Sequence, residues 1–229
     1  MTYPITIVDN FFDNPDDIVE LAKSFKYYSP DTGNWPGTRT KQMHLEDHRF
    51  FTYFGQKIHL LFHDNCPDQW TMQCHFQNIR PFAKGNKNRG WVHQDIDTHF
   101  GGIVYLSKNP EPNTGTSIYK TKQGYCTQYL SELKIKERHY LGEDIPDEEY
   151  DEAFNAMMDQ FVETVTVENV YNRLVLFNSK TYHGVKTFGN KPRLTLNFFG
   201  MGMSGKLPPI MRSRSVSYTH LTLPTKDSV

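Results

Sequence analysis

The chain has 229 residues, of which 37% are hydrophobic and 22% are charged, and its formal net charge is −1. This near-neutral balance gives no reason to expect a nucleic acid or an anionic membrane as partner, and no stretch reaches the roughly 18–20 apolar residues that span a bilayer. The three cysteines form no paired framework, and the N-terminal segment is acidic where a signal peptide would be basic. We therefore expect a cytoplasmic protein with no membrane partner.

The N-terminal part, residues 1–69, is predicted to form a helical support. A β-rich strand is expected over 3–8. It is followed by a helix over about 14–27, which opens with a capping Asn, a Pro and two acids, and these residues suit the positive end of a helix. Residues 29–40 are rich in turn formers and predict a loop. A second helix is expected over 46–62, where phenylalanines recur at helical spacing.

From residue 70 onward the pattern changes to short β-rich segments separated by turns, which is typical of an all-β sandwich or barrel. The predicted strands are 70–79, 91–96, 101–106, 116–119, 162–167, 173–177, 182–185 and 193–199. They belong to a β core made of residues 70–119 and 163–200. The segment 120–162 interrupts this core and is predicted to be an insertion with a helix that starts near Ile145.

We predict a single domain over residues 1–205. The following segment, 206–229, is predicted to be a disordered or non-native tail, because VSYTHL at 216–221 is what a transposase recognition end used in sequencing adapters encodes.

His93 and Asp95 supply two parts of a metal site. In a strand, residues i and i+2 point to the same face, so both side chains are expected to aim at one spot. His183, at the start of another predicted strand, is the best candidate for a third ligand. Two imidazoles and one carboxylate with open coordination positions form the facial set typical of non-haem Fe(II). Asp97 has the same parity as Asp95 and is an alternative carboxylate ligand.

The turn at 188–192 is expected to join two paired strands as a hairpin. If residue 187 pairs with residue 193, then His183 faces Asn197 and shares one face of the sheet with Arg193 and Thr195. The opposite face of the last strand is apolar. A polar inward face and an apolar outward face predict a barrel with a polar pocket, covered outside by the N-terminal helices.

These motifs resemble the Fe(II)- and 2-oxoglutarate-dependent oxygenases, in particular the prolyl-hydroxylase-like branch. The likeness lies in residues 70–119 and 170–200. It rests on His93-x-Asp95, on His183, on Arg193 ten residues later with Thr195 after it, and on Tyr105-Leu106-Ser107, which is similar to a Tyr-Leu-Asn strand of that branch. The sequence departs from the branch before His93, where Phe76, Gln77, Asn78 and Arg80 lie in the region in which a Tyr is usual.

The resemblance implies a mainly β fold with flanking helices (α+β). Its core is expected to be a double-stranded β-helix, or jelly roll, with the N-terminal helices packed on one sheet and a helical insertion. The implied cofactors are Fe(II), 2-oxoglutarate and O2, and the implied reaction hydroxylates a substrate while 2-oxoglutarate is decarboxylated to succinate. The implied metal ligands are His93, Asp95 and His183, and the implied residues for the far carboxylate of 2-oxoglutarate are Arg193, Thr195 and Tyr105.

Three other functions compete with this one. They are a cupin-like metal-binding protein without 2-oxoglutarate turnover, a non-catalytic jelly-roll module, and a nucleic-acid demethylase. The basic loop 83–90 motivates the last, but no aromatic stacking platform accompanies it, so we expect no nucleic-acid partner. The sequence does not name the substrate, whether a small molecule, an amino acid or a peptide side chain, or the oligomeric state. We expect specificity to lie in 29–45, 83–90 and 120–162.

Overall fold

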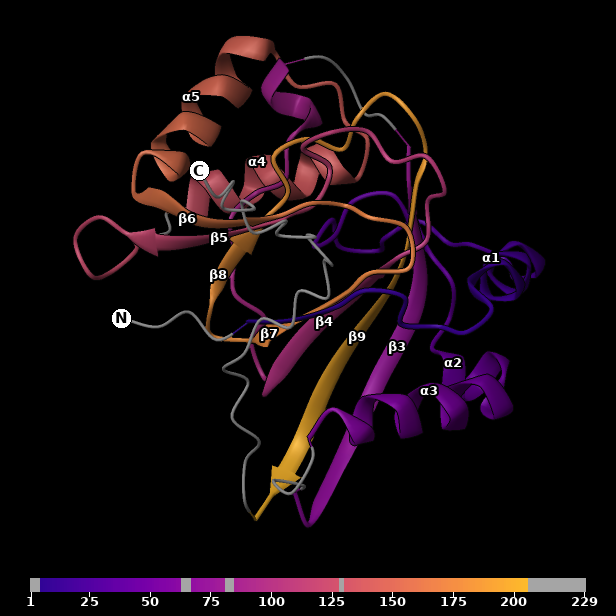
Figure 1. Cartoon of the computed structure of the whole chain (residues 1–229). Helices are drawn as coiled ribbons and strands as arrows, with labels where there is room; N and C mark the ends of the chain where they lie inside the picture. The colour runs from indigo at the N-terminus through magenta and orange to yellow at the C-terminus, as the bar shows by residue number, and fades with distance from the viewer. Residues whose placement is uncertain (1–4, 63–66, 81–84, 128–129, 206–229) are drawn as a thin grey trace, which may run out of the picture.

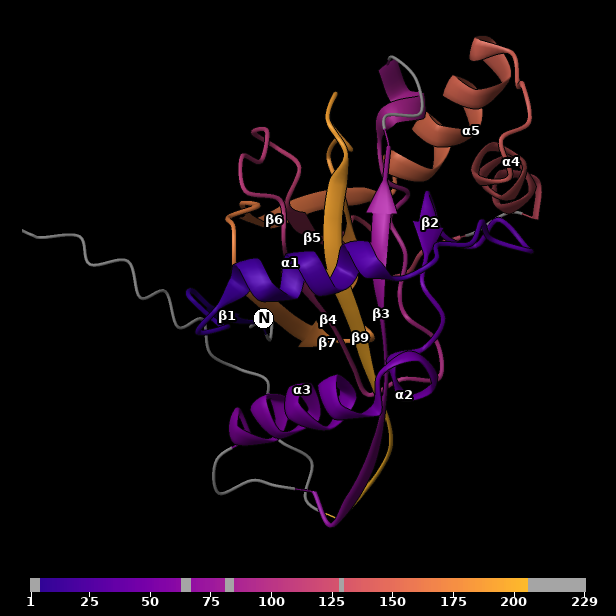
Figure 2. The same cartoon turned by 90° about the vertical axis from the view of Figure 1, so that its right-hand side faces the viewer.

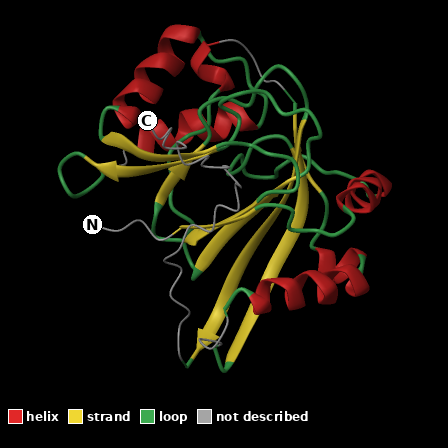
Figure 3. Cartoon of the chain, in the orientation of Figure 1, coloured by secondary structure: helices red, strands yellow, loops and turns green. Residues whose placement is uncertain are grey.

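The computed structural model describes residues 5–62, 67–80, 85–127 and 130–205. The predicted tail 206–229 and Cys66 lie outside the described residues. Two antiparallel sheets face one another, with helices outside them (Figures 1 and 3). The prediction of a mainly β chain with a few helices is therefore confirmed.

The larger sheet has the strand order β1-β7-β4-β9-β3-β2 and the smaller sheet the order β6-β5-β8. The strands are β1 (Ile5–Val8), β2 (Thr38–Arg39), β3 (Gln69–Ile79), β4 (Phe100–Tyr105), β5 (Thr116–Thr121), β6 (Phe161–Val167), β7 (Leu174–Asn178), β8 (Tyr182–Gly184) and β9 (Arg193–Ser204). The helices are α1 (Pro15–Ser24), α2 (Met43–Glu46), α3 (His48–Leu60), α4 (Leu130–Tyr140) and α5 (Asp147–Met158), with a 3-10 turn at Gly85–Asn88. None of the helices within the described residues has the length and apolar character that crossing a bilayer needs.

Helices α1 and α3 cover the outer face of the larger sheet (Figure 2). Their buried apolar side chains pack against alternate residues of β3, β9 and β7, which include Phe76, Leu196 and Leu174. The predicted helix over 46–62 corresponds to α3, and the short helix α2 precedes it. The side chain of Asp47 accepts hydrogen bonds from the backbone N–H groups of Arg49 and Phe50, at 3.0 and 2.9 Å, and so caps the start of α3. Asn14, in contrast, makes no side-chain capping hydrogen bond on α1.

The insertion contains two helices, α4 and α5, where the sequence predicted one. They form a second apolar cluster with the smaller sheet, in which Ile135 of α4 and Phe154 of α5 are buried. Helix α4 escaped prediction because charged residues lie on every side of LSELKIKERHY, which leaves no clear apolar face.

A third cluster lies between the two sheets. Val175 and Phe177 of β7 and Tyr105 of β4 pack there against Ile118 of β5. Successive residues of β7 thus contact opposite layers, since Leu174 and Leu176 belong to the cluster under the N-terminal helices. The inner face of the larger sheet is the floor on which the functional site is built.

Two predictions about this inner region are wrong. Residues 91–96 do not form a strand, and only His93 makes an isolated bridge, to His183. The strands β8 and β9 do not form a hairpin either: β8 pairs with β5, and β9 lies between β4 and β3. Eight residues separate β8 from β9, which is enough chain to cross from one sheet to the other, so the turn residues at 188–192 do not impose pairing.

His75 on β3 is buried inside this core with only 4% of its surface exposed. Burial, helped by the positive charge of Arg39, holds its pKa well below the usual value near 6.5. The unfolded chain therefore binds a proton below pH 6.5 that folded His75 does not. We expect the free energy of unfolding of the metal-free protein to fall as the pH drops from 7.5 to 5.5.

One such histidine contributes about 1.4 kcal/mol per pH unit once its unfolded form is protonated. Urea unfolding at both pH values measures this loss. His75→Phe should reduce the loss, whereas His59→Gln, at an exposed position of α3, should leave it unchanged. An equal loss in wild type and in His75→Phe would contradict the assignment.

Candidate metal centre and carboxylate pocket

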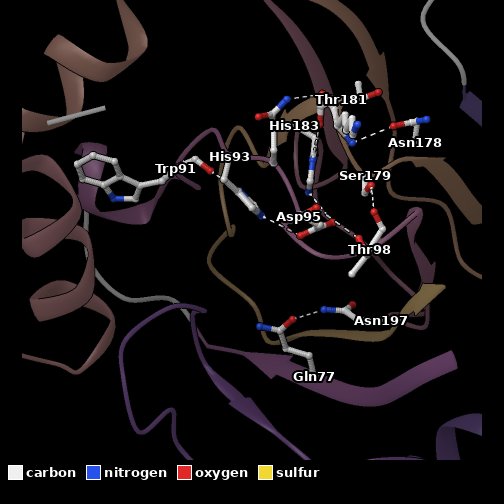
Figure 4. A network of polar contacts seen from close by, with 12 residues as sticks. Gln77, Trp91, His93, Asp95, Thr98, Asn178, Ser179, Thr181, His183 and Asn197 are labelled. Carbon is white, nitrogen blue, oxygen red and sulfur yellow. Dashed lines mark hydrogen bonds and ion pairs between the residues drawn. The ribbon is translucent and has the colours of Figure 1, made fainter. Parts of the chain in front are cut away.

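His93, Asp95 and His183 come together at the mouth of the space between the sheets (Figure 4). Their candidate ligand atoms all lie within 4.8 Å of one another. One carboxylate oxygen of Asp95 lies 3.8 Å from Nε2 of His93, and the other lies 3.6 Å from Nε2 of His183. Asp97, the alternative carboxylate, is exposed in the following turn with a φ of +65° and takes no part in this cluster.

The local backbone explains this convergence. His93 and His183 exchange two backbone hydrogen bonds, of 3.0 and 2.9 Å, which places the two rings 4.3 Å apart. The backbone N–H of Asp95 donates to the carbonyl of Ser179 at 3.1 Å, and this contact holds the chain against the end of β7. The Ser179 hydroxyl in turn donates to the carbonyl of Thr98. The three side chains are thus fixed by backbone pairing between two distant segments.

The Nδ1 atoms of both imidazoles, which point away from Asp95, form hydrogen bonds to backbone carbonyls. Nδ1 of His93 donates to the carbonyl of Trp91, and Nδ1 of His183 donates to the carbonyl of Thr181, each at 2.9 Å. A carbonyl only accepts, so each Nδ1 carries a proton, and in the neutral form of each ring Nε2 presents its lone pair toward Asp95. Backbone hydrogen bonds of this kind fix the orientation and tautomer of histidines that bind metals.

The pKa of His93 also suits metal binding. The pKa of His93 lies well below its usual value, because of burial first, and then because of the neighbouring His183 and the charge of Lys136. A low pKa keeps the imidazole neutral at physiological pH, which is the form that binds a metal. One oxygen of Asp95, Oδ2, is buried and makes no hydrogen bond within the described residues.

Gly101 on β4 lies directly behind the Asp95 carboxylate. A Cβ added at this position would lie 2.5 Å from Oδ2 of Asp95. We expect Gly101→Ala to push the carboxylate off the histidines and to weaken metal binding by about tenfold or more, in the range seen when the support of a ligand is lost. Metal titration of the purified variant measures the effect.

Gly55→Ala is the matched control, because a Cβ there would meet only the end of the flexible Met72 side chain, at 3.7 Å. Equal metal affinity in Gly101→Ala and wild type would show that Asp95 does not need this space.

Arg193 and Thr195 lie on the inner face of β9, as the alternation of the strand predicted. Arg193 is 3% exposed and Thr195 is fully buried. Nε of Arg193 donates to the carbonyl of Thr114 at 2.8 Å, but Nη2 of Arg193 and Oγ1 of Thr195 are buried and lack a hydrogen-bond partner among the described residues. Burial lowers the pKa of Arg193. A buried guanidinium without a carboxylate is costly, so this end of the site is suited to an anion.

Tyr105 completes this end of the site. It lies directly opposite Thr195 in the sheet register, and its ring lies 5.4 Å from the Arg193 guanidinium. Its hydroxyl is 2.6 Å from the hydroxyl of Thr116 on the facing sheet. Thr116 was not predicted as a site residue, since only the packing of the two sheets brings it close.

His93, Asp95, His183, Thr116 and Arg193 line one cavity of about 880 Å³. The wall also includes Gln77 and Asn197, whose side chains hydrogen-bond to each other below the metal cluster (Figure 4). Gln77 therefore points inward in the region where the sequence departs from the prolyl-hydroxylase-like pattern. Arg39 from β2 and Lys136 from α4 line the cavity too, and no sequence signal singled them out.

The segments that carry Arg39 and Lys136 meet over the cavity. Gly33 has a φ of +69°, and a Cβ added there would lie 2.2 Å from the backbone oxygen of Glu137 on α4. Only glycine allows the loop before β2 to approach α4 this closely.

A family model described as "Family of unknown function (DUF6445)" matches residues 1–199. The chain belongs to this family. No curated protein matches the sequence of this DUF6445 member.

Solved structures do resemble the DUF6445 chain in fold. HygX from Streptomyces hygroscopicus, solved with nickel and 2-oxoglutarate, is 11% identical with a TM-score of 0.58, and the match covers 87% of this chain and 83% of HygX. The epimerase SnoN from nogalamycin biosynthesis, solved with Fe3+, alpha ketoglutarate and nogalamycin RO, is 14% identical with a TM-score of 0.56 and coverage of 87% and 79%. A prolyl-4-hydroxylase from Pseudomonas putida is 14% identical with a TM-score of 0.50 and coverage of 87% and 93%. The DUF6445 chain therefore has the fold of 2-oxoglutarate oxygenases.

Proposed function

We propose that this protein is an Fe(II)- and 2-oxoglutarate-dependent oxygenase of the prolyl-hydroxylase-like kind, built on a double-stranded β-helix within one domain. Three observations support the metal site. The Nε2 atoms of two histidines and one carboxylate converge, both Nδ1 atoms are anchored to backbone carbonyls, and Oδ2 of Asp95 lacks a hydrogen bond among the described residues. This donor set is the facial one that suits Fe(II) with open positions. His93, Asp95 and His183 are its proposed ligands.

The observation that carries the proposal is Arg193, which lines the same cavity and forms no ion pair among the described residues. Its Nη2 and the hydroxyl of Thr195 are the kind of donors that hold a carboxylate. Arg193 lines the cavity that also contains the metal cluster, and Thr195 lies two residues further along the same strand. We assign the far carboxylate of 2-oxoglutarate to Arg193 and Thr195, with Tyr105 and Thr116 beside it. A cupin-like metal protein or a structural module does not require a buried cation that forms no ion pair among the described residues.

Iron, 2-oxoglutarate and dioxygen together supply a reaction in which the co-substrate becomes succinate and CO2, one oxygen atom enters succinate and the other becomes the hydroxyl group of the substrate. The residues of the chain bind the metal and the co-substrate and set their orientation. The backbone pairing of His93 with His183 holds both rings in place, and Gly101 leaves room for the Asp95 carboxylate. Arg193 and Thr195 would hold the far carboxylate of the co-substrate, and the three proposed ligands would hold the metal in the same cavity.

The proposal is tested with protein purified without oxygen. It should bind one Fe(II) per chain and form succinate from 2-oxoglutarate in air. It should reach its full affinity for 2-oxoglutarate only when the metal is bound. If the protein neither binds about one metal ion per chain nor forms succinate, the proposed function is refuted and only the likeness of fold remains. Metal binding without any 2-oxoglutarate binding would favour the cupin-like function instead.

A further inference from the structure

After the groups assigned to iron and 2-oxoglutarate are set aside, the cavity still contains two cationic side chains. Arg39 comes from the short strand β2 and Lys136 from the inserted helix α4, far apart in the sequence. Gly33, in the loop before β2, approaches the backbone of Glu137, the neighbour of Lys136, so the two segments that carry these cations meet. Both cations line the cavity that also contains the metal cluster.

Arg39 is held in place but its charge is not neutralised. Its guanidinium lies over the ring of Trp35 at 4.4 Å, and one nitrogen, Nη2, donates to Oε1 of Gln77 at 3.4 Å. Its Nε is buried and has no hydrogen-bond partner within the described part of the chain. Burial lowers its pKa to about 9, so Arg39 stays charged at neutral pH. Stacking on Trp35 fixes the plane of a fork that can donate two parallel hydrogen bonds.

Lys136 is in a similar state. It is half-buried, and its ammonium lies 5.9 Å from the ring centre of Tyr140. Burial lowers its pKa, although the negative charges of Glu137 and Asp95 act in the opposite direction. Glu132 and Glu137 also line the cavity. Among the described residues, however, neither Arg39 nor Lys136 lies within ion-pair distance of any carboxylate.

Two partly buried cations that form no ion pair among the described residues are stabilised by an anion that binds between them. The wall beside them is apolar and aromatic, and it includes Trp35, Ile79 and Trp91. A cavity of about 880 Å³ can hold a small molecule next to a co-substrate.

We propose that the substrate of this site is a small molecule with a carboxylate group, which binds between Arg39 and Lys136 while its apolar body lies against Trp35 and the neighbouring wall. Its role as the substrate rests on the proposed oxygenase function. The binding of the anion does not, because it depends only on the two cations and the apolar wall.

The test is calorimetric binding of matched acid and amide pairs that differ in charge alone. The probes are phenylacetate and phenylacetamide, hexanoate and hexanamide, and N-acetylphenylalanine and its amide. They are titrated without oxygen into protein with Fe(II) and 2-oxoglutarate, and into protein with neither. We expect at least one acid to bind about tenfold or more tightly than its amide, because hydrogen bonds to charged groups are the strong ones.

Arg39→Gln and Lys136→Gln should each remove most of this preference for the acid. Arg138→Gln is the matched control, since Arg138 lies on the same helix but forms ion pairs with the exposed Glu143 and Glu149 outside the cavity. Lys136 makes no side-chain hydrogen bond among the described residues, so its variant should fold even if Arg39→Gln does not. Thermal unfolding of the Arg39→Gln and Lys136→Gln proteins shows whether each variant is folded.

Equal binding of acids and amides, binding of none of the acids, or a preference that survives in the Lys136 and Arg39 variants would each overturn the proposal. So would an Arg39→Gln protein that loses affinity for 2-oxoglutarate and keeps its affinity for the acids, because Arg39 would then belong to the co-substrate. Charge-selective binding in a protein that forms no succinate would refute the oxygenase function alone. Succinate formation without charge-selective binding would refute the carboxylate site alone.

Discussion

Asp95→Asn is expected to weaken Fe(II) binding by more than about 100-fold and to abolish succinate formation. The carboxylate is the only negative ligand of the proposed set, and even the loss of groups that merely support a ligand costs about 10–100-fold in metal affinity. The neutral amide keeps the shape of the side chain, so the fold should be preserved. Anaerobic metal titration and a 2-oxoglutarate turnover assay measure the two effects.

Asp97→Asn is the matched control for this prediction. Asp97 lies two residues further along the chain and is exposed, and its φ of +65° suits asparagine as well as aspartate. It should bind Fe(II) and turn over 2-oxoglutarate as the wild type does. The reverse result, with loss in Asp97→Asn and none in Asp95→Asn, would assign the ligand to Asp97 and refute the site as proposed.

Arg193→Met is expected to weaken 2-oxoglutarate binding by about 100-fold while Fe(II) binding stays within a few-fold of wild type. Arg193 supplies the buried positive charge for the far carboxylate, and a pair of charge-assisted hydrogen bonds is worth a few kcal/mol. Among the described residues Arg193 contacts Thr114 and Tyr105 and forms no hydrogen bond or ion pair with the three ligands, so its replacement leaves them in place. Titrating 2-oxoglutarate into the metal-loaded, oxygen-free protein measures the loss.

Arg193→Lys refines this prediction. Lysine keeps the charge but not the planar fork, so its affinity for 2-oxoglutarate should fall between those of wild type and Arg193→Met. Unchanged 2-oxoglutarate affinity in both variants would contradict the assignment to Arg193 and would indicate that the co-substrate binds elsewhere in the cavity. A parallel loss of Fe(II) and 2-oxoglutarate would instead indicate that Arg193 supports the whole inner face of the sheet.

The sequence predicted the members of the candidate site better than it predicted their connections. Arg193, Thr195 and Asn197 share the inner face because a strand alternates whatever its partner is, so this inference survives the loss of the predicted hairpin. His93 and Asp95 do converge, but not as i and i+2 of a strand. A single bridge to His183 and a backbone hydrogen bond to Ser179 bring them together, and such long-range contacts leave no local signal.

The same limit explains what the sequence did not indicate. Arg39 lies in a strand of two residues within a turn-rich loop, and Lys136 lies on a helix without a clear apolar face. Thr116 becomes a site residue only because the smaller sheet packs over the larger one. The N-terminal helices, in contrast, were found because one face of each repeats apolar residues at helical spacing, and this face is the one that covers the larger sheet.

The close approach of Gly33 to Glu137 has an evolutionary consequence. The loop before β2 leads into Arg39 and the inserted helix α4 carries Lys136, and the two segments touch backbone to backbone at a point where no side chain fits. A change in the length or path of one segment therefore forces a change in the other. We expect the two to vary together among relatives, and a chimera that receives the insertion of another family member to need that member's loop as well before it acquires the donor's substrate preference.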